Sequence, residues 1–429
     1  MILNDYKIIK NLCYGCGTCA GVCPTGSMTM QKDKLGVFTP SYNGDLCIRC
    51  NNCVNVCPAT AEYKHHCDIV KQEENLMNPC RKAFVGYTKN DQVRNKATSG
   101  GIITTLLDWA IREKIIDSAL VVKSKTDDPF SSEATIIFDC PSLYESSGSR
   151  YLPVEFSSAI KAIIYNENIK KTAIVGLPCH IHGITLAQSL LPNLNEKIIF
   201  KIGLFCKQTK DIRFTDMILA KMKLNKNEVK SIKYRAKGWP GNIVVTLKNE
   251  QIKIFPYNYF NMLWGALSCS PKSCLTCTDS MSRYADISVG DAWLPDYINE
   301  EQGTSVILAR TQTGQKLLNQ AITKNKIAIQ SIDPTEILKV QPKFIVQAKK
   351  ENYWSRCKIL GLSNKNIKKL YSKKQSSQNF SEAVWVFIVR FFSSSLIFRK
   401  LYPYLPNLIH KTINKAHILI WEKLAKRNQ

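Results

Sequence analysis

The chain has 429 residues, of which 45% are apolar and 22% charged, so two to four globular domains are expected and an extended disordered chain is excluded. The formal net charge of +25 favours acidic partners such as a phosphate-bearing cofactor or an anionic membrane. Seventeen cysteines, many closely spaced, indicate metal ligation in a reducing compartment, not a disulfide scaffold. The first residues lack a secretory signal and no apolar run is long enough to span a membrane, so we expect a cytoplasmic protein.

Residues 1–65 contain the pattern CxxCxxCxxxCP twice, at a constant offset of 34 residues. In such a repeat, three closely spaced thiolates and one from the other copy hold each 4Fe-4S cube. We therefore assign one cluster to Cys13, Cys16, Cys19 and Cys57, and the other to Cys47, Cys50, Cys53 and Cys23. Zinc sites or disulfides are the remote alternative. Between the copies, alternating residues from Ser27 to Pro40 predict a hairpin around Asp33-Lys34.

Residues 66–97 are polar and interrupted by proline and glycine, which suggests a linker. From residue 98 to about residue 345, strand and helix signals alternate, and they predict an α/β or α+β domain with a mixed sheet, taken as parts 98–165 and 166–345. The expected strands are 119–123, 134–138, 172–175, 198–205, 243–247, 252–255, 286–289 and 305–309.

An amphipathic helix is expected to begin at Ser99-Gly100-Gly101 and to end near Lys114, with Thr98 or Ser99 as its N-cap. Bare backbone at a helix start suits an anion, such as a cofactor phosphate. An ordinary N-cap with a tight turn explains the same residues equally well.

Several cysteines lie outside the repeat. Cys179 follows a strand and a Gly-Leu-Pro turn, at a predicted helix N-terminus that should lower its pKa. Cys206 ends a long apolar strand, and Cys274 and Cys277 form a CxxC pair. We expect these four, Cys179, Cys206, Cys274 and Cys277, to hold a third 4Fe-4S cluster, with Cys269 in reserve. The alternatives are unliganded core cysteines and, less favoured, a nucleophile formed by Cys179 with His180 or His182.

Residues 346–429 form a basic tail. Within it, residues 349–429 carry 17 Lys and Arg against 3 Asp and Glu. The apolar stretch 383–398 suits an interfacial helix at the inner face of an anionic membrane. A helical pair packed on the protein body is an equal alternative. Nucleic-acid binding is not expected, because no recognised nucleic-acid-binding motif accompanies the charge.

The segments TSGG, GSRY, VGLPCHIHGI, GLFC and CLTCTDSMSRYADISVGDAW recur in this order in one family. The chain resembles the beta subunit family of coenzyme F-420 hydrogenases and dehydrogenases over about residues 1–345, including a fused bacterial-type two-cluster ferredoxin. The resemblance implies FAD, a further 4Fe-4S cluster, and electron transfer between a hydride-carrying substrate and the clusters. Some relatives are bacterial proteins associated with surface-polysaccharide synthesis.

The resemblance also implies site residues. The cofactor-binding positions that it implies are Ser99, Gly100, Gly101, Ser149, Arg150, Tyr151, Gly176, Pro178 and Asp291. Asp291 belongs to the family's ADIS-GD-W stretch, which Asp286, Gly290 and Trp293 also match. Two positions depart from the family: His180 stands where Gln is usual, and Leu177 where Thr is usual.

Flavin accepts a hydride as two electrons and releases them singly, whereas a cluster takes one. The expected function is therefore an FAD and iron–sulfur oxidoreductase with a redox partner protein and a small hydride donor or acceptor, either F-420-like or unidentified. The alternative is a non-catalytic electron-transfer subunit that docks a partner enzyme at the membrane. Catalytic residues are not assigned.

Overall fold

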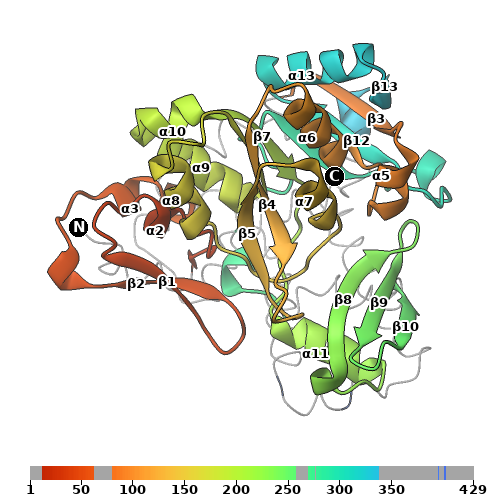
Figure 1. The fold of residues 1–429 in the computed structure, drawn as a ribbon, viewed down its shortest axis with the longest axis horizontal. Coiled ribbons are helices and arrows are strands. Elements are labelled where there is room, and N and C mark those ends of the chain that lie inside the picture. Colours follow the sequence, from red (N-terminus) through yellow and green to blue (C-terminus); the bar gives the residue numbers. More distant parts are fainter. Residues whose placement is uncertain are drawn as a thin grey trace, which may run out of the picture.

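The computed structural model describes residues 12–61, 80–257, 269–275 and 277–337, together with the single residues 395 and 401. Figure 1 shows a small N-terminal module, drawn in red, beside a larger α/β body. We call residues 12–61 the cysteine module. Its elements are α2 (Thr18–Gly21), β1 (Met28–Lys32), β2 (Phe38–Tyr42), the 3-10 turn η2 (Gly44–Leu46) and α3 (Asn52–Asn55).

The expected hairpin in the cysteine module is confirmed. Strands β1 and β2 pair antiparallel, with Met28 opposite Tyr42 and Lys32 opposite Phe38. The Asp33 carboxylate closes the turn by accepting hydrogen bonds from the amides of Leu35 (2.8 Å) and Val37 (2.9 Å).

The body is built on an eight-stranded mixed sheet in the order β13-β3-β12-β11-β7-β6-β4-β5. Strands β4, β6, β7 and β11 are parallel, and the others pair antiparallel with their neighbours. The strands are β3 (Lys82–Thr88), β4 (Ser118–Ser124), β5 (Ser132–Ile137), β6 (Thr172–Gly176), β7 (Ile198–Leu204), β11 (Ile287–Asp291), β12 (Ser305–Ala309) and β13 (Ile327–Ile332).

Both faces of this sheet are covered, because alternate strand residues are apolar on each side. Along β12, Ile307 and Ala309 pack with Leu106 and Leu318 on one face, whereas Val306 faces the other. The first face carries α6 (Ile102–Arg112) and α13 (Gln312–Thr323), and the second carries α8 (Ser157–Tyr165), α9 (Pro178–Leu190) and α10 (Pro192–Lys197). Shorter segments complete the body: α5 (Asp91–Lys96), α7 (Cys140–Glu145) and the 3-10 turns η5 (Lys272–Leu275), η6 (Pro295–Tyr297) and η7 (Pro334–Glu336).

All eight strands expected from the sequence are present, although the linker over 66–97 is wrong in its second part. Residues 82–88 form β3, which pairs with both β12 and β13. Gly86 lies inside this strand, where a β-carbon would come within 2.7 Å of the Ile329 α-carbon. The glycine is thus a close-approach residue of a sheet and not a loop signal. The parts expected over 98–165 and 166–345 do not form separate sheets. Strands β4 and β5, from the first part, and β6 and β7, from the second, belong to the same eight-stranded sheet.

A second, three-stranded sheet lies apart from the first (Figure 1). It is antiparallel in the order β10-β9-β8, and one face packs on α11 through Phe214, Ile218 and Val245. Its elements are α11 (Ile212–Lys221), the 3-10 turn η3 (Lys226–Glu228), β8 (Val229–Ala236), β9 (Asn242–Leu247) and β10 (Ile252–Pro256).

Among the described residues, none of the helices combines the length and the apolar character that a membrane span requires. The expected basic tail over 346–429 lies outside the described residues, apart from Ser395 and Leu401.

Candidate functional site: three cysteine sets and a polar sheet edge

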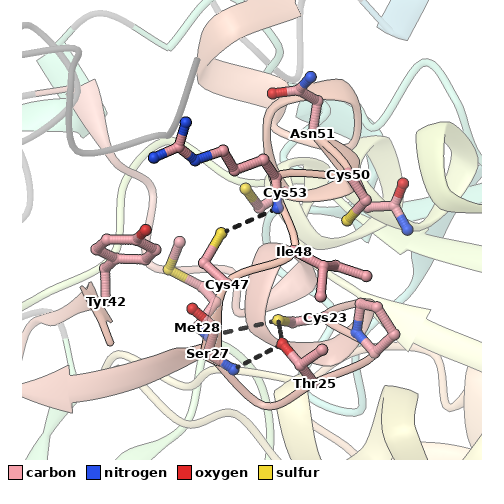
Figure 2. A pocket seen from close by; sticks show the side chains of 13 residues that line it. Cys23, Thr25, Ser27, Met28, Tyr42, Cys47, Ile48, Cys50, Asn51 and Cys53 are labelled. Carbon is pink, nitrogen blue, oxygen red and sulfur yellow. Dashed lines mark hydrogen bonds between the residues drawn. The ribbon is translucent and has the colours of Figure 1, made fainter. Parts of the chain in front are cut away.

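The eight cysteines of the repeat surround two separate cavities in the cysteine module. Figure 2 shows the first, which opens beside the loop that precedes α3. We call its cysteines the outer set: Cys23, Cys47, Cys50 and Cys53. Cys50 is exposed, and the neighbouring side chains of Leu46 and Ile48 are 50% and 64% exposed. The outer set therefore lies at the protein surface.

The second cavity, about 330 Å³ of space between protein atoms and partly open to solvent, is lined by the inner set: Cys13, Cys16, Cys19 and Cys57. Each cavity thus takes three cysteines from one copy of the repeat and the fourth from the other copy. This is the crossed grouping that the sequence predicts for two cubic clusters. No disulfide joins the cysteines of the described ranges, and no three His, Cys, Asp or Glu residues within those ranges converge on a single-ion site.

The two sets differ electrostatically. Burial raises the pKa of Cys16 to about 11, and burial together with neighbouring thiols raises the pKa of Cys19 as well. In the outer set, the Arg49 amide donates to the Cys47 sulfur (3.4 Å) and lowers its pKa. The Met28 amide donates to Cys23 (3.4 Å), and hydrogen bonds of this kind outweigh the opposing effect of burial and lower the Cys23 pKa.

A third cysteine set forms where strands β6 and β7 end. Cys179 is the second residue of α9, Cys206 follows β7, and Cys274 lies in η5. Cys206, Cys277 and Cys274 are all close enough to Cys179 to raise its pKa electrostatically, although burial is the larger cause. The structure therefore brings together the four cysteines that the sequence grouped: Cys179, Cys206, Cys274 and Cys277.

The expected lowering of the Cys179 pKa is wrong. The helix N-terminus is present, but burial and like-charged neighbours raise the pKa well above its usual value. Cys269, the reserve ligand, lies elsewhere: it packs in the core of the small sheet, and its thiol contacts the Met217 sulfur at 3.7 Å.

The inner and third sets lie next to each other across the junction between module and body. Cys16 is the first cysteine among the neighbours that raise the Cys179 pKa. A β-carbon on Gly183 of α9 would lie 3.5 Å from the Cys16 sulfur and would overlap the Thr18 hydroxyl. The Phe156 amide also donates to the Cys16 carbonyl (3.0 Å), which fixes the junction.

His180 has a structural role next to this junction. Its Nδ1 accepts from the Leu177 amide (3.3 Å), so Nε2 carries the proton and donates to the Val154 carbonyl (3.0 Å). The ring stacks on Phe156, and burial lowers its pKa to about 4. A neutral histidine with both nitrogens occupied does not act as the base of Cys179.

The expected flavin residues gather at the edge where β6, β7 and β11 end, which is the usual ligand edge of an open α/β sheet. The N-cap expected at Thr98 or Ser99 is wrong: the cap is Gly101, with φ +73°. Ser99 instead donates to the Thr304 carbonyl (2.9 Å) and contacts the Ser305 hydroxyl (3.0 Å). A β-carbon on Gly100 would lie 2.9 Å from the Ser305 amide, so this glycine is required by sheet packing.

The GSRY segment crosses the same edge. The Ser149 and Thr98 hydroxyls are 2.9 Å apart. Arg150 donates to the Ser124 hydroxyl and to the carbonyls of Ser146 and Gly148, at 2.7–3.2 Å. These partners are all neutral, and burial lowers the Arg150 pKa to about 10. The guanidinium therefore stays charged at neutral pH in a half-buried position.

One residue of this edge, Arg235 of β8, is not anticipated by the sequence. Its guanidinium donates to the Asp291 carboxylate (2.7 Å) and to the Thr98 carbonyl (2.6 Å), so it links the small sheet to the TSGG turn. The ring of Tyr257 lies 5.3 Å from it. An isolated arginine in a strand carries no sequence signal for such a role, because its partners come from distant segments.

The remaining family positions have hydrogen-bonding and packing roles in and around the sheet. Asp286 accepts from the Lys201 amide (2.8 Å) and from the Thr311 hydroxyl (2.6 Å), and Gly290 leaves room for Phe205. Trp293 packs on Trp239, with ring centres 4.4 Å apart. Of the others, Gly176 ends β6, Pro178 begins α9, and Tyr151 lies edge-on to Tyr234 at 5.7 Å.

Paired crossed cysteine sets beside a mixed sheet define an iron–sulfur electron-transfer protein of the oxidoreductase type. Family models agree: residues 12–61 match the 4Fe-4S dicluster domain, and residues 83–161 and 169–335 match the N- and C-terminal domains of the coenzyme F-420 hydrogenase/dehydrogenase beta subunit. The chain belongs to this beta subunit family, with a ferredoxin domain at its N-terminus.

Several of the relatives are named for an activity. The chain is 27% identical to the coenzyme F-420-dependent sulfite reductase of Methanocaldococcus jannaschii, covering 82% of this chain and 54% of that longer one. It is 24% identical to one subunit of the F(420)H(2) dehydrogenase of Methanosarcina mazei, covering 80% and 91%. A chain of the F-420-reducing [NiFe] hydrogenase complex from Methanosarcina barkeri shares the fold, with a TM-score of 0.51 at 20% identity over 65% and 93% of the two chains.

Proposed function

We propose that this chain is a flavin and iron–sulfur oxidoreductase subunit that passes single electrons between a partner protein and a hydride carrier. The observation that carries the proposal is the placement of the cysteine sets. The outer set lies at the surface, the inner set lies behind it, and the third set lies against the inner set at the edge of the sheet. Three 4Fe-4S clusters held by these twelve cysteines would form a continuous route through the protein.

The surroundings of the third set suit a cluster in particular. Burial and mutual repulsion disfavour four thiolates in one place. Cluster iron removes this penalty, because a coordinating thiol is deprotonated and its charge is neutralised by the metal. The grouping of Cys179, Cys206, Cys274 and Cys277 therefore favours a ligand set over four unrelated core cysteines.

For the flavin, we propose a site at the polar sheet edge. Arg150 is a half-buried cation whose partners are neutral, so it can hold a phosphate of FAD in addition to its present contacts. The Ser149 and Thr98 hydroxyls lie next to it, and Arg235 orders the turn through its bond to the Thr98 carbonyl. The bound flavin would supply the conversion between hydride and single-electron transfer.

The substrate proposed for this site is a hydride carrier of the F-420 type, because the relatives are named for that coenzyme. The protein partner is a redox protein or a further subunit, in line with relatives that are subunits of larger complexes. We place the protein in the cytoplasm, and the basic tail would supply contact with an anionic membrane or with a membrane-bound glycan-synthesis complex.

A non-catalytic electron-transfer subunit remains the second candidate, and one observation favours it. The space beside Gly100 and Gly101 is filled by the sheet, Thr88 and Val93, so these glycines are explained without a cofactor. That candidate predicts clusters without flavin and no reaction with hydride donors.

Anaerobic purification with iron and flavin analysis tests the proposal. We expect about twelve irons and one FAD per chain, and reduction of the clusters by a reduced deazaflavin or a nicotinamide. A content of about eight irons would remove the third cluster. Twelve irons without flavin would contradict the flavin site and support the non-catalytic electron-transfer subunit.

A further inference from the structure

The segment that follows Cys277 folds tightly around the third set. The Cys277 thiol donates to the Asp279 carbonyl (3.3 Å), and the Asp279 carboxylate accepts from the Met281 and Arg283 amides at 3.0 Å each. The Cys206 amide donates to the Ser280 carbonyl (2.9 Å). Ser280 is therefore close to two cysteines of the third set. It follows Cys277 by three residues in the chain, and its carbonyl is hydrogen-bonded to the Cys206 amide.

The Ser280 side chain is 3% exposed, and its hydroxyl has no hydrogen-bond partner within the described part of the chain. Nearby polar side chains are engaged, since Thr278 accepts from Arg283 and Asp279 binds two amides. A buried hydroxyl is costly unless it forms a hydrogen bond. An acceptor at this place would satisfy Ser280.

A second unpaired hydroxyl among the described residues, on Ser282, lies in a different environment. It is fully buried against Gly203 of β7, where a β-carbon would overlap it. Gly203 precedes Cys206 by three residues of chain, on the strand side of the third set. Ser282 thus shares the burial and the missing partner of Ser280 but lacks its contact with a cysteine backbone.

We propose that the Ser280 hydroxyl donates a hydrogen bond to a sulfur of the third cluster and raises its reduction potential. The inference rests on the proposed function, because the acceptor is a cluster held by the third set. Reduction adds negative charge to the cluster sulfurs, so a donated hydrogen bond stabilises the reduced form more than the oxidised form. Ser280 is a positioning and tuning residue, and no bond is made or broken at it.

The test is a redox titration of the anaerobically purified full chain, followed by electron paramagnetic resonance. The third cluster is identified as the signal that Cys274→Ser removes. In Ser280→Ala, we expect its equilibrium constant for one-electron reduction to fall about tenfold, a downward shift of about 59 mV. The signals of the other two clusters should keep their potentials. Ser280→Thr, which retains a hydroxyl, should have a potential close to that of the wild type.

Ser282→Ala is the matched control, and it should leave all three potentials unchanged. An unchanged third potential in Ser280→Ala, at full iron content, would overturn the inference but leave the proposed function intact. An equal shift in Ser282→Ala would also overturn it, because the effect would then come from general loosening of the buried segment. A wild-type chain with about eight irons would instead refute the third cluster itself.

Discussion

The sulfur of Cys16 lies 3.5 Å from the point that a β-carbon on Gly183 would occupy. The two residues belong to the cysteine module and to helix α9, and the side chains of Cys16 and Thr18 pack against the bare backbone of Gly183. Cys179, four residues before Gly183 on the same helix, belongs to the third set. Together with the hydrogen bond from the Phe156 amide to the Cys16 carbonyl (3.0 Å), this contact joins the inner set to the body.

Substituting Gly183 should weaken that connection. In Gly183→Ala, the added methyl group overlaps the Thr18 hydroxyl, so the junction must move apart at a cost of about 1–3 kcal/mol in unfolding free energy. We expect weaker magnetic coupling between the inner and third clusters and slower filling of the third cluster after rapid mixing with a reductant. Gly44→Ala is the control, because a β-carbon there makes an ordinary 3.6 Å contact with Tyr42. Identical spectra for both variants would contradict the direct route.

The assignment of the third set predicts a specific loss of iron. Cys274→Ser removes one of four thiolates, and iron should fall from about twelve to about eight per chain while the signals of the module remain. Cys269→Ser is the matched control: this thiol is buried near Met217 in the small-sheet core, and its loss should leave the iron content unchanged. Loss of iron in Cys269→Ser alone would show that Cys269, and not Cys274, is the cluster ligand.

The exposed loop at the outer set predicts where a protein partner donates or accepts electrons. In Ile48→Glu, an added charge at a 64% exposed apolar position should slow reduction by a low-potential ferredoxin at least tenfold, whereas reduction by dithionite should not change. Ile252→Glu, at a 58% exposed position on β10, should leave both rates unchanged. The comparison is made by stopped-flow absorbance. Equal rates for Ile48→Glu and the wild type would place the partner elsewhere.

The flavin proposal predicts a role for the Arg150 charge. Arg150→Gln keeps a donor but removes the cation, so FAD should be lost at least tenfold more readily during gel filtration, with iron content unchanged. The control Arg112→Gln removes an exposed arginine that is paired with Asp108 on α6, and it should retain flavin. Gly100→Asp is a poor test, because it would clash with the sheet even if no flavin bound there. Full flavin retention by Arg150→Gln would contradict this location.

Local patterns in the sequence were sufficient for the cysteine cavities and for most of the sheet. The fixed spacing of the repeat determined the crossed grouping, and apolar runs located the strands that the structure confirms. Strand β3 was missed because Gly86 resembles a turn signal. The position is glycine because the backbone of β13 passes too close for a side chain. Arg235 was missed because its partners, Asp291 and Thr98, are distant in sequence. The pKa of Cys179 was misjudged because burial depends on segments that the motif does not contain.

Two glycines of the cysteine module limit which segments could replace it on this body. A β-carbon on Gly17 would lie 2.6 Å from the Phe156 amide, and one on Gly21 would lie 2.7 Å from the Ile160 β-carbon. The module therefore packs on α8 and its N-cap residue Phe156 at two positions that have room for glycine but not for a larger residue. A replacement dicluster segment with side chains at these two positions would clash with Phe156 and Ile160 and could not pack on the body in the same way. A larger side chain on either side of this contact therefore needs a compensating change on the other side.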